Sequence, residues 1–163
     1  MKMKRIMTLL GLIIFASSVA TAQNFKYIGA AKCKMCHNKP QKGEQYNVWQ
    51  AGPHANAMKS LSAEEAKDPK CLKCHSTAGA IDPKMKGGIQ VTEGVSCESC
   101  HGPGSAYKSP ALMKNRNAAM SKGLIVPDEA LCKTCHNSES PTFKGFDYEE
   151  YMAKIAHDDP LTK

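Results

Sequence analysis

Aromatic side chains are scarce in this chain of 163 residues, which has one Trp, five Tyr and four Phe. With so few large side chains, an ordinary hydrophobic core is not enough to stabilise the fold, and another group must fill the interior. A mean hydropathy of −0.42 also excludes a protein with several membrane spans. The length allows one domain, and no low-complexity segment or clear linker divides it.

Long hydrophobic runs are also missing, apart from residues 6–16 near the N-terminus. This run is too short to span a bilayer, and three positively charged residues precede it. Small residues follow it up to Ala22, as in the cleavage site of a signal peptide. We therefore predict a signal peptide over residues 1–22, cleaved after Ala22. The mature domain, residues 23–163, is expected in the periplasm without a membrane span.

Basic residues outnumber acidic ones by 22 to 15, which gives a formal charge of +7. Such an excess can indicate a nucleic-acid partner, but no basic run with interleaved aromatic residues occurs. Three of the basic residues also lie in the predicted signal peptide. We therefore expect no nucleic-acid partner, and a lysine-rich surface that is solvated or helps another protein to dock.

All eight Cys residues fall into four C-x-x-C pairs, and a His follows each pair directly. The motifs are Cys33-Lys-Met-Cys36-His37, Cys71-Leu-Lys-Cys74-His75, Cys97-Glu-Ser-Cys100-His101 and Cys132-Lys-Thr-Cys135-His136. Two thiols at this spacing bind the two vinyl groups of a haem, and the adjacent His binds its iron. Zinc sites and disulfides also use paired Cys, but neither requires a His after every second Cys. The motifs therefore predict four covalently attached haem c groups.

Four haems leave about 35 residues of the mature chain for each cofactor. The porphyrins must then supply most of the apolar interior, and folding must depend on their attachment. They must also lie close together, which favours electron transfer between the irons. We predict a mostly α fold: a compact multihaem cytochrome of short helices and loops around four haems, with little β-structure.

Proline, glycine and capping signals divide the chain into short helices. Ser62 and Asp147 each precede a Glu by three residues, which is the spacing of a capping box. Helices are expected at residues 44–51, 54–61, 111–122 and 148–157, and a short strand at residues 89–91.

Each haem iron has a second axial position, and only His54 and His157 lie outside the four motifs. We predict both as distal iron ligands. At most two haems can then have two His ligands from this chain. The other two need a Met, a Lys, a residue of another chain, or an open site. Met113 and Met120 are candidates because, seven residues apart, they share a face of the expected helix 111–122, although packing on a porphyrin would explain them equally.

Longer blocks around the motifs resemble the tetrahaem cytochrome c-554 family of nitrifying bacteria and its broader relatives. The blocks are Tyr27–His37, Trp49–Met58, Gly94–Gly104 and Phe146–His157. The resemblance implies a compact α-helical electron carrier whose haems are stacked in pairs.

The resemblance also implies which haems the two distal His residues serve. It assigns His54 to the haem at His101, and His157 to the haem at His136. The haem at His75 would lack a sixth ligand from the protein.

The chain departs from the family pattern at the first haem. The family has a further His after the Gly-Pro-Gly sequence, and it binds the iron of that haem. Here residues 105–113 contain no His. Our hypothesis is therefore that Met113 or Met120 replaces this His as the sixth ligand of the iron at His37.

These observations favour an electron-transfer protein, not an enzyme, that passes electrons between redox partner proteins as a monomer or weak oligomer. One alternative is a haem enzyme that acts on nitric oxide, nitrite or hydroxylamine at an open haem site. The sequence shows no set of distal acid–base groups for such chemistry. Another alternative is a subunit of a cytochrome filament, in which a neighbouring chain supplies the missing ligands.

Overall fold

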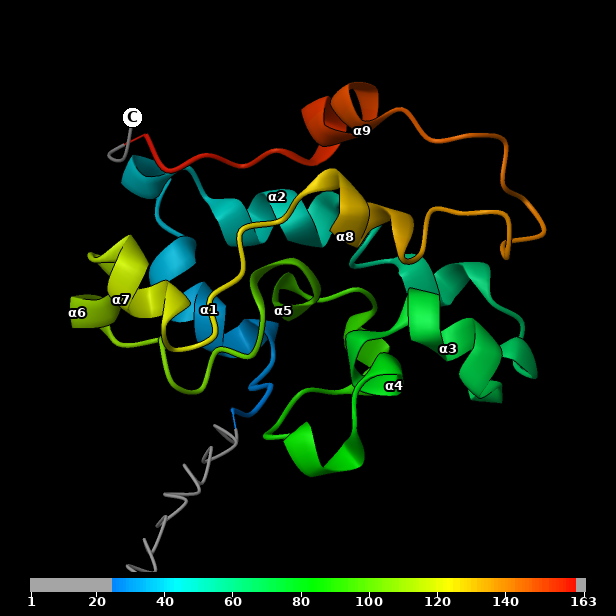
Figure 1. The fold of residues 1–163 in the computed structure, drawn as a ribbon, viewed down its shortest axis with the longest axis horizontal. Coiled ribbons are helices and arrows are strands. Elements are labelled where there is room, and N and C mark those ends of the chain that lie inside the picture. The colour runs from blue at the N-terminus through cyan, green and yellow to red at the C-terminus, as the bar shows by residue number, and fades with distance from the viewer. Residues whose placement is uncertain (1–24, 161–163) are drawn as a thin grey trace, which may run out of the picture.

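The computed structural model describes residues 25–160, which are folded into short helices joined by loops (Figure 1). The predicted signal peptide and its cleavage site lie outside the described residues. The α-helices are α1 (Ala30–His37), α2 (Gln45–Ala51), α3 (Pro69–His75), α4 (Thr77–Ala80), α5 (Cys97–His101), α6 (Pro110–Met113), α7 (Arg116–Met120), α8 (Glu129–Lys133) and α9 (Tyr148–Ile155). The 3₁₀-helices are η1 (Pro40–Lys42), η2 (Ala57–Ser60), η3 (Glu65–Lys67), η4 (Pro83–Met85) and η5 (Val91–Glu93).

The mostly α prediction is confirmed. Residues 25–160 contain no β-strand, and one isolated bridge pairs Tyr27 with Lys86. Within the same residues, no helix has the length and hydrophobicity needed to cross a membrane.

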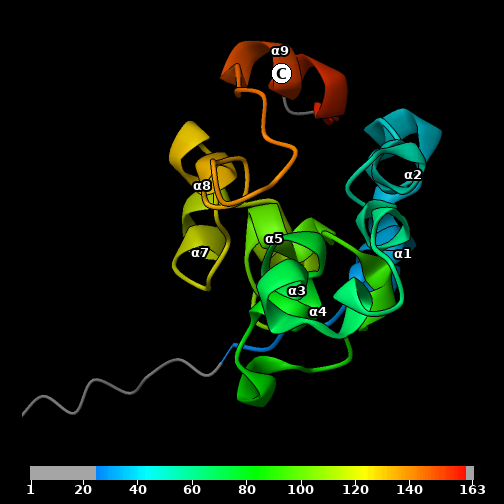
Figure 2. The same cartoon turned by 90° about the vertical axis from the view of Figure 1, so that its right-hand side faces the viewer.

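Helix α5 lies at the centre of the molecule. In Figure 1, α1, α6 and α7 lie towards one end of the long axis, α3 lies towards the other, and α5 is between them. The view turned by 90° places α5 between α7 and α8 on one side and α1 and α2 on the other (Figure 2). The third C-x-x-C-H motif, which forms α5, is therefore central in both views.

Side-chain caps decide where several of these helices begin. Asp68, Asp128 and Asp147 accept hydrogen bonds from backbone N–H groups of the first turns of α3, α8 and α9. The capping box at Ser62 is also present, because Ser62 and Glu65 each bind the other's backbone N–H. It begins only the single turn of η3.

The expected helix over residues 54–61 is replaced by a turn and η2. The carbonyl oxygen of His54 accepts a hydrogen bond from the N–H of Val95 at 2.9 Å, which ties this turn to a distant segment. The Asn56 side chain donates to the carbonyl of Gly52 at 2.8 Å and closes the turn locally.

The expected helix over residues 111–122 is broken in two. The Asn115 side chain accepts a hydrogen bond from the N–H of Ala118 at 3.0 Å and caps a new helix, α7. Met113 ends α6 and Met120 ends α7, so the prediction that they share one helix face is wrong.

Two smaller predictions also differ from the structure. The expected strand at residues 89–91 is absent, because Gln90 and Glu93 form a capping box that begins η5 at Val91. Helix α9 ends at Ile155 and Ala156 is extended, so His157 follows the helix instead of ending it.

The buried hydrophobic set is small for a chain of this length. Within residues 25–160 it consists of Ala30, Ala78, Ile89, Tyr107 and Ala119, of which only Ile89 and Tyr107 are large. Larger apolar side chains, including Met120, Ile125, Val126 and Phe143, are exposed. The polypeptide therefore forms a thin layer of helices and loops with little core of its own.

Candidate haem sites

A buried carboxylate joins the first and third attachment motifs. Glu98 of α5 is 1% exposed. Its two oxygens accept hydrogen bonds from the N–H of Ile28 (3.0 and 2.9 Å), Gly29 (2.7 Å) and Gly104 (2.7 Å). Because Gly29 directly precedes α1, these bonds hold the helix of the first motif against the helix of the third.

A second carboxylate supports the same junction. Glu93 accepts a hydrogen bond from the N–H of Ala30, the first residue of α1, at 2.8 Å. Gly29 has a φ of +85°, and a Cβ atom there would lie 2.6 Å from an oxygen of Glu93. Only glycine fits this close approach without strain.

The thiols of the first and third motifs meet at this junction. The Cys33 and Cys97 side chains are hydrogen-bonded, which raises the pKa of Cys97, and burial acts in the same direction. The first and third attachment sites are therefore neighbours, although more than sixty residues separate them in the chain.

The second and fourth motifs form a similar pair. Burial and a hydrogen bond with Cys135 raise the pKa of Cys74 to about 11. The sulfur of Cys135 also lies 3.8 Å from the carbonyl oxygen of Lys73. The Lys73 side chain forms an ion pair with Glu139, just beyond the fourth motif.

The two pairs of motifs are connected through the third and fourth. Burial raises the pKa of Cys100, and the neighbouring Cys132 thiol adds to the shift. The fourth motif starts in α8 and ends in the turn that follows it. Each attachment site thus has at least one other attachment site beside it.

The two His residues outside the motifs each face a motif His. The ring centroids of His54 and His136 are 6.1 Å apart, with an angle of 64° between the ring planes. Those of His101 and His157 are 6.0 Å apart, with an angle of 78°. This is the reverse of the pairing implied by the resemblance, which assigned His54 to His101 and His157 to His136.

Tertiary contacts explain the reversed pairing. The backbone of His54 is fixed through its bond to Val95, whose carbonyl oxygen accepts the Trp49 indole N–H at 2.8 Å. His157 lies on the extended chain after α9, where its Nδ1 is 2.8 Å from the carbonyl oxygen of Ile155. Because that carbonyl oxygen only accepts, Nδ1 carries the proton and Nε2 keeps its lone pair.

These rings fit the axial positions of haem iron. A bond from a metal to an imidazole nitrogen is about 2 Å long, so two imidazoles on opposite sides of one metal have centroids about 6 Å apart. Burial lowers the pKa values of His54, His101 and His136, which keeps these imidazoles neutral, the form that donates a lone pair.

The cysteines are arranged in a way that fits haem attachment. All eight are free thiols, so they form no disulfide. Within residues 25–160, no group of three or more Cys, His, Asp or Glu side chains is arranged to hold a metal ion such as zinc. Exposed apolar side chains around a small core fit a porphyrin interior.

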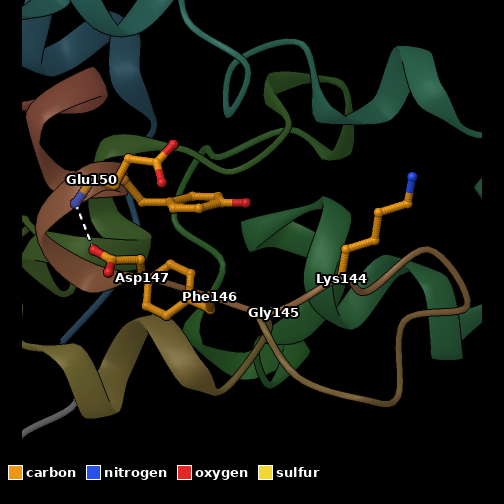
Figure 3. A pocket seen from close by; sticks show the side chains of 6 residues that line it. Lys144, Gly145, Phe146, Asp147 and Glu150 are labelled. Carbon is orange, nitrogen blue, oxygen red and sulfur yellow. Dashed lines mark hydrogen bonds between the residues drawn. The ribbon is translucent and has the colours of Figure 1, made fainter.

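A cavity of about 370 Å³ lies beside His136, between α9 and the segment before it (Figure 3). Phe146 and Tyr151 line it, and their ring centroids are 4.8 and 5.7 Å from that of His136. Lys144, Asp147 and Glu150 form its polar part.

Comparisons with known proteins agree with this interpretation. The family model described as cytochrome c554 and c-prime matches residues 32–102. Cytochrome c-554 of Nitrosomonas europaea is 28% identical over 168 residues, which cover 82% of this chain and 68% of that protein. This chain is similar to the cytochrome c-554 family.

More distant likenesses support the same conclusion. The C-type polyheme cytochrome OmcC of Geobacter sulfurreducens is 31% identical over 88 residues, which cover 47% of this chain and 11% of that protein. The solved structure of reduced cytochrome c554 from Nitrosomonas europaea matches with a TM-score of 0.54 and 23% identity, over 83% of this chain and 85% of that one. It has the same fold.

The comparisons with cytochrome c-554 confirm the predicted cofactor. The protein is a c-type cytochrome with covalently bound haem c, and it functions in electron transfer. The chain provides the thiols that attach the haem and the imidazoles that hold its iron, and the iron supplies a reversible one-electron centre.

His75 of this cytochrome differs from the paired His residues. Its Nδ1 lies 2.9 Å from the carbonyl oxygen of Ala57 and 3.3 Å from the Ser60 hydroxyl. The carbonyl contact fixes the ring and leaves Nε2 free to bind iron. His54 and His157 lie beside the rings of His136 and His101 and not beside His75.

The predicted methionine ligands are not brought together by the fold. Met113 and Met120 lie on separate helices and are both exposed. Either of them as a ligand of the iron at His37 stays a prediction.

Sequence reasoning did not single out several side chains that shape the sites. Glu98 occupies one of the two variable positions inside the third motif. Its role becomes visible only from the backbone amides that are packed around it. Phe146 and Tyr151 were also not predicted as site residues. The clustering of aromatic residues before His157 was the sequence feature that could have indicated them.

Loss of the Asp147 cap is expected to weaken the site that α9 builds. Asp147→Ala removes the hydrogen bond to the N–H of Glu150 and should lower the free energy of unfolding by about 1 kcal/mol. Thermal unfolding of the holoprotein measures this, with Glu149→Ala as a control that keeps the cap and also removes one acidic group from the first turn. Equal stability of the two variants would contradict a role for the cap.

Proposed function

We propose that this cytochrome is an exported conduit that passes single electrons between redox partner proteins through four haems in one continuous line. After removal of residues 1–22, residues 23–163 form a single tetrahaem domain in the periplasm. The protein is not an enzyme and acts as a monomer or weak oligomer. The observation that supports the proposal is that each attachment motif lies beside the next in one series.

The series runs in a different order from the chain. Cys33 of the first motif contacts Cys97 of the third, Cys100 of the third lies beside Cys132 of the fourth, and Cys135 of the fourth contacts Cys74 of the second. The order by proximal ligand is therefore His37, His101, His136 and His75. Helices α1 and α3, which carry the two terminal sites, lie towards opposite ends of the long axis (Figure 1).

We assign the axial ligands from the ring geometry. His37, His75, His101 and His136 bind the four irons, and each lies beside its own pair of attaching thiols. His157 is the second His ligand of the iron at His101, and His54 is the second His ligand of the iron at His136. The irons at His37 and His75 have no second His, and Met113 and Met120 remain the candidates for His37.

The mature protein is expected to carry four haems and to take up four electrons. Its mass should equal that of residues 23–163 plus four haem groups, and a reductive titration should saturate at four electrons per chain. The EPR spectrum of the oxidised protein should contain two low-spin species with two His ligands each. A colourless product, or fewer than four haems per chain, would refute the proposal.

A second candidate function is chemistry on a small nitrogen species at the haem of His75. The observation in its favour is that both distal His residues are engaged elsewhere, which leaves that iron without a His partner. Nitric oxide or cyanide added to the oxidised protein should then change one haem spectrum of the four. Spectra that stay entirely low-spin and unchanged would exclude this candidate.

A filament subunit would behave differently on dilution. If a neighbouring chain supplied the missing ligands, the fraction of low-spin haem would fall as the protein is diluted. If the fraction of low-spin haem stays constant over a dilution of about a hundredfold, the result supports a monomeric carrier.

A further inference from the structure

Glu98 carries a negative charge in the interior of the protein. Its carboxylate is 1% exposed, and all four of its hydrogen bonds come from backbone N–H donors. A protonated carboxyl group would place its own O–H against one of these donors, so the geometry requires the ionised form. Amide dipoles stabilise the charge but do not cancel it.

Among the described residues, 25–160, no ion pair neutralises this charge. Within residues 25–160 the ion pairs join Lys73 to Glu139, Lys133 to Glu129 and Lys154 to Glu150, and none of them includes Glu98 or Glu93. Glu93 is likewise held by neutral donors, the N–H of Ala30 and the hydroxyl of Ser96. In the described part of the chain, two carboxylates that form no ion pair therefore occupy one junction.

The junction lies between the attachment sites of the first and third motifs. Glu98 adjoins Cys97 in the chain, and its oxygens bind the two residues that precede α1, the helix that carries Cys33. Glu93 binds the first residue of that helix. Both charges thus face the attachment sites of the first and third motifs.

The second and fourth motifs have no comparable group. Their variable positions hold Leu72, Lys73, Lys133 and Thr134. The acidic side chains beside them, Glu129 and Glu139, are 49% and 66% exposed and are paired with lysines. Water and the paired cations screen these charges, whereas the low-dielectric interior does not screen Glu98.

We infer that Glu98, supported by Glu93, lowers the reduction potentials of the haems attached at the His37 and His101 motifs relative to the other two. Ferric haem carries one more positive charge than ferrous haem, so a fixed buried anion stabilises the oxidised form. The inference rests on the proposed haem order. It makes the conduit asymmetric: an electron on the His37 and His101 side moves downhill towards the His136 and His75 side.

The test is the Glu98→Gln substitution in the four-haem protein. Glutamine keeps the size of the side chain and removes its charge. The equilibrium between oxidised and reduced forms should shift about tenfold towards reduction at the His37 and His101 haems, which is about 59 mV for a one-electron centre. A redox titration followed by NMR of haem methyl signals, each assigned to its attachment site, measures the four potentials separately.

Three further variants separate charge from structure. Glu98→Asp keeps the charge and disturbs the hydrogen bonds, so its potentials should stay near those of the parent even if the protein is less stable. Glu129→Gln removes an exposed, paired charge from another attachment helix and should leave the potentials nearly unchanged. Glu93→Gln provides a second test if Glu98→Gln does not fold, with a smaller upward shift at the same two haems.

Specific outcomes would overturn the inference. They are an equal shift at all four haems, no shift in Glu98→Gln, or a shift in Glu98→Asp as large as in Glu98→Gln. If Glu98→Gln does not fold, the absence of a selective shift in Glu93→Gln overturns it. The number of haems and of electrons taken up reports on the proposed function independently, because both should remain at four in every folded variant.

Discussion

Replacing Cys97 and Cys100 together with serine is expected to reduce the yield of folded holoprotein about tenfold or more. The third motif lies beside two others, with Cys97 at Cys33 and Cys100 at Cys132. Loss of its haem would remove apolar volume from the centre of a protein whose buried core, within residues 25–160, contains two large hydrophobic residues. Haem-stained gels and intact mass measure the yield and the haem count.

The matched control is the same double substitution at the terminal second motif, Cys71 and Cys74. This motif adjoins only the fourth, so its loss should give a three-haem protein in clearly higher yield. A three-haem product with normal yield and thermal stability from the Cys97 and Cys100 variant would contradict a central role for that haem. Failure of both variants alike would show that haem attachment is required everywhere and that position in the series does not matter.

Substituting His157 with alanine should convert one haem, the one attached at His101, from low-spin to high-spin. The ring centroids of His101 and His157 are 6.0 Å apart, and His157 supplies the second imidazole of that iron in our assignment. Removing a sixth ligand changes the spin state completely at that centre, so the EPR signal of one low-spin haem per molecule should disappear. Added imidazole should restore it.

Substituting His54 with alanine should have the same effect at a different place, the haem attached at His136. The two variants therefore distinguish the pairing seen in the structure from the reverse pairing that the family resemblance implied. Lys154→Ala, which removes an exposed ion pair from α9, is the control and should leave all spin states unchanged. Loss of the His136 signal in the His157 variant would show that the pairing in the structure is wrong.

Local sequence signals predicted the parts of the fold that depend on neighbouring residues. Asp147 caps α9 and the Ser62 box begins η3, because side-chain and backbone partners three residues apart are fixed by the chain itself. The same reasoning failed at residues 111–122, where helix periodicity concealed the competing cap at Asn115. It also failed at His54, where a bond to Val95 outweighed helix formation.

The sequence by itself determined the cofactor and its number, because thiol spacing and an adjacent imidazole are local chemistry that every C-x-x-C-H motif repeats. It also limited the distal His ligands to His54 and His157, by composition alone. Only the tertiary structure decided which motif His lies beside each of them, which attachment sites are neighbours, and that Glu98 is buried between two of these sites. Those properties depend on contacts between segments that are dozens of residues apart in the chain. The contacts are made by backbone amides and by the positions of rings, which no local sequence motif predicts.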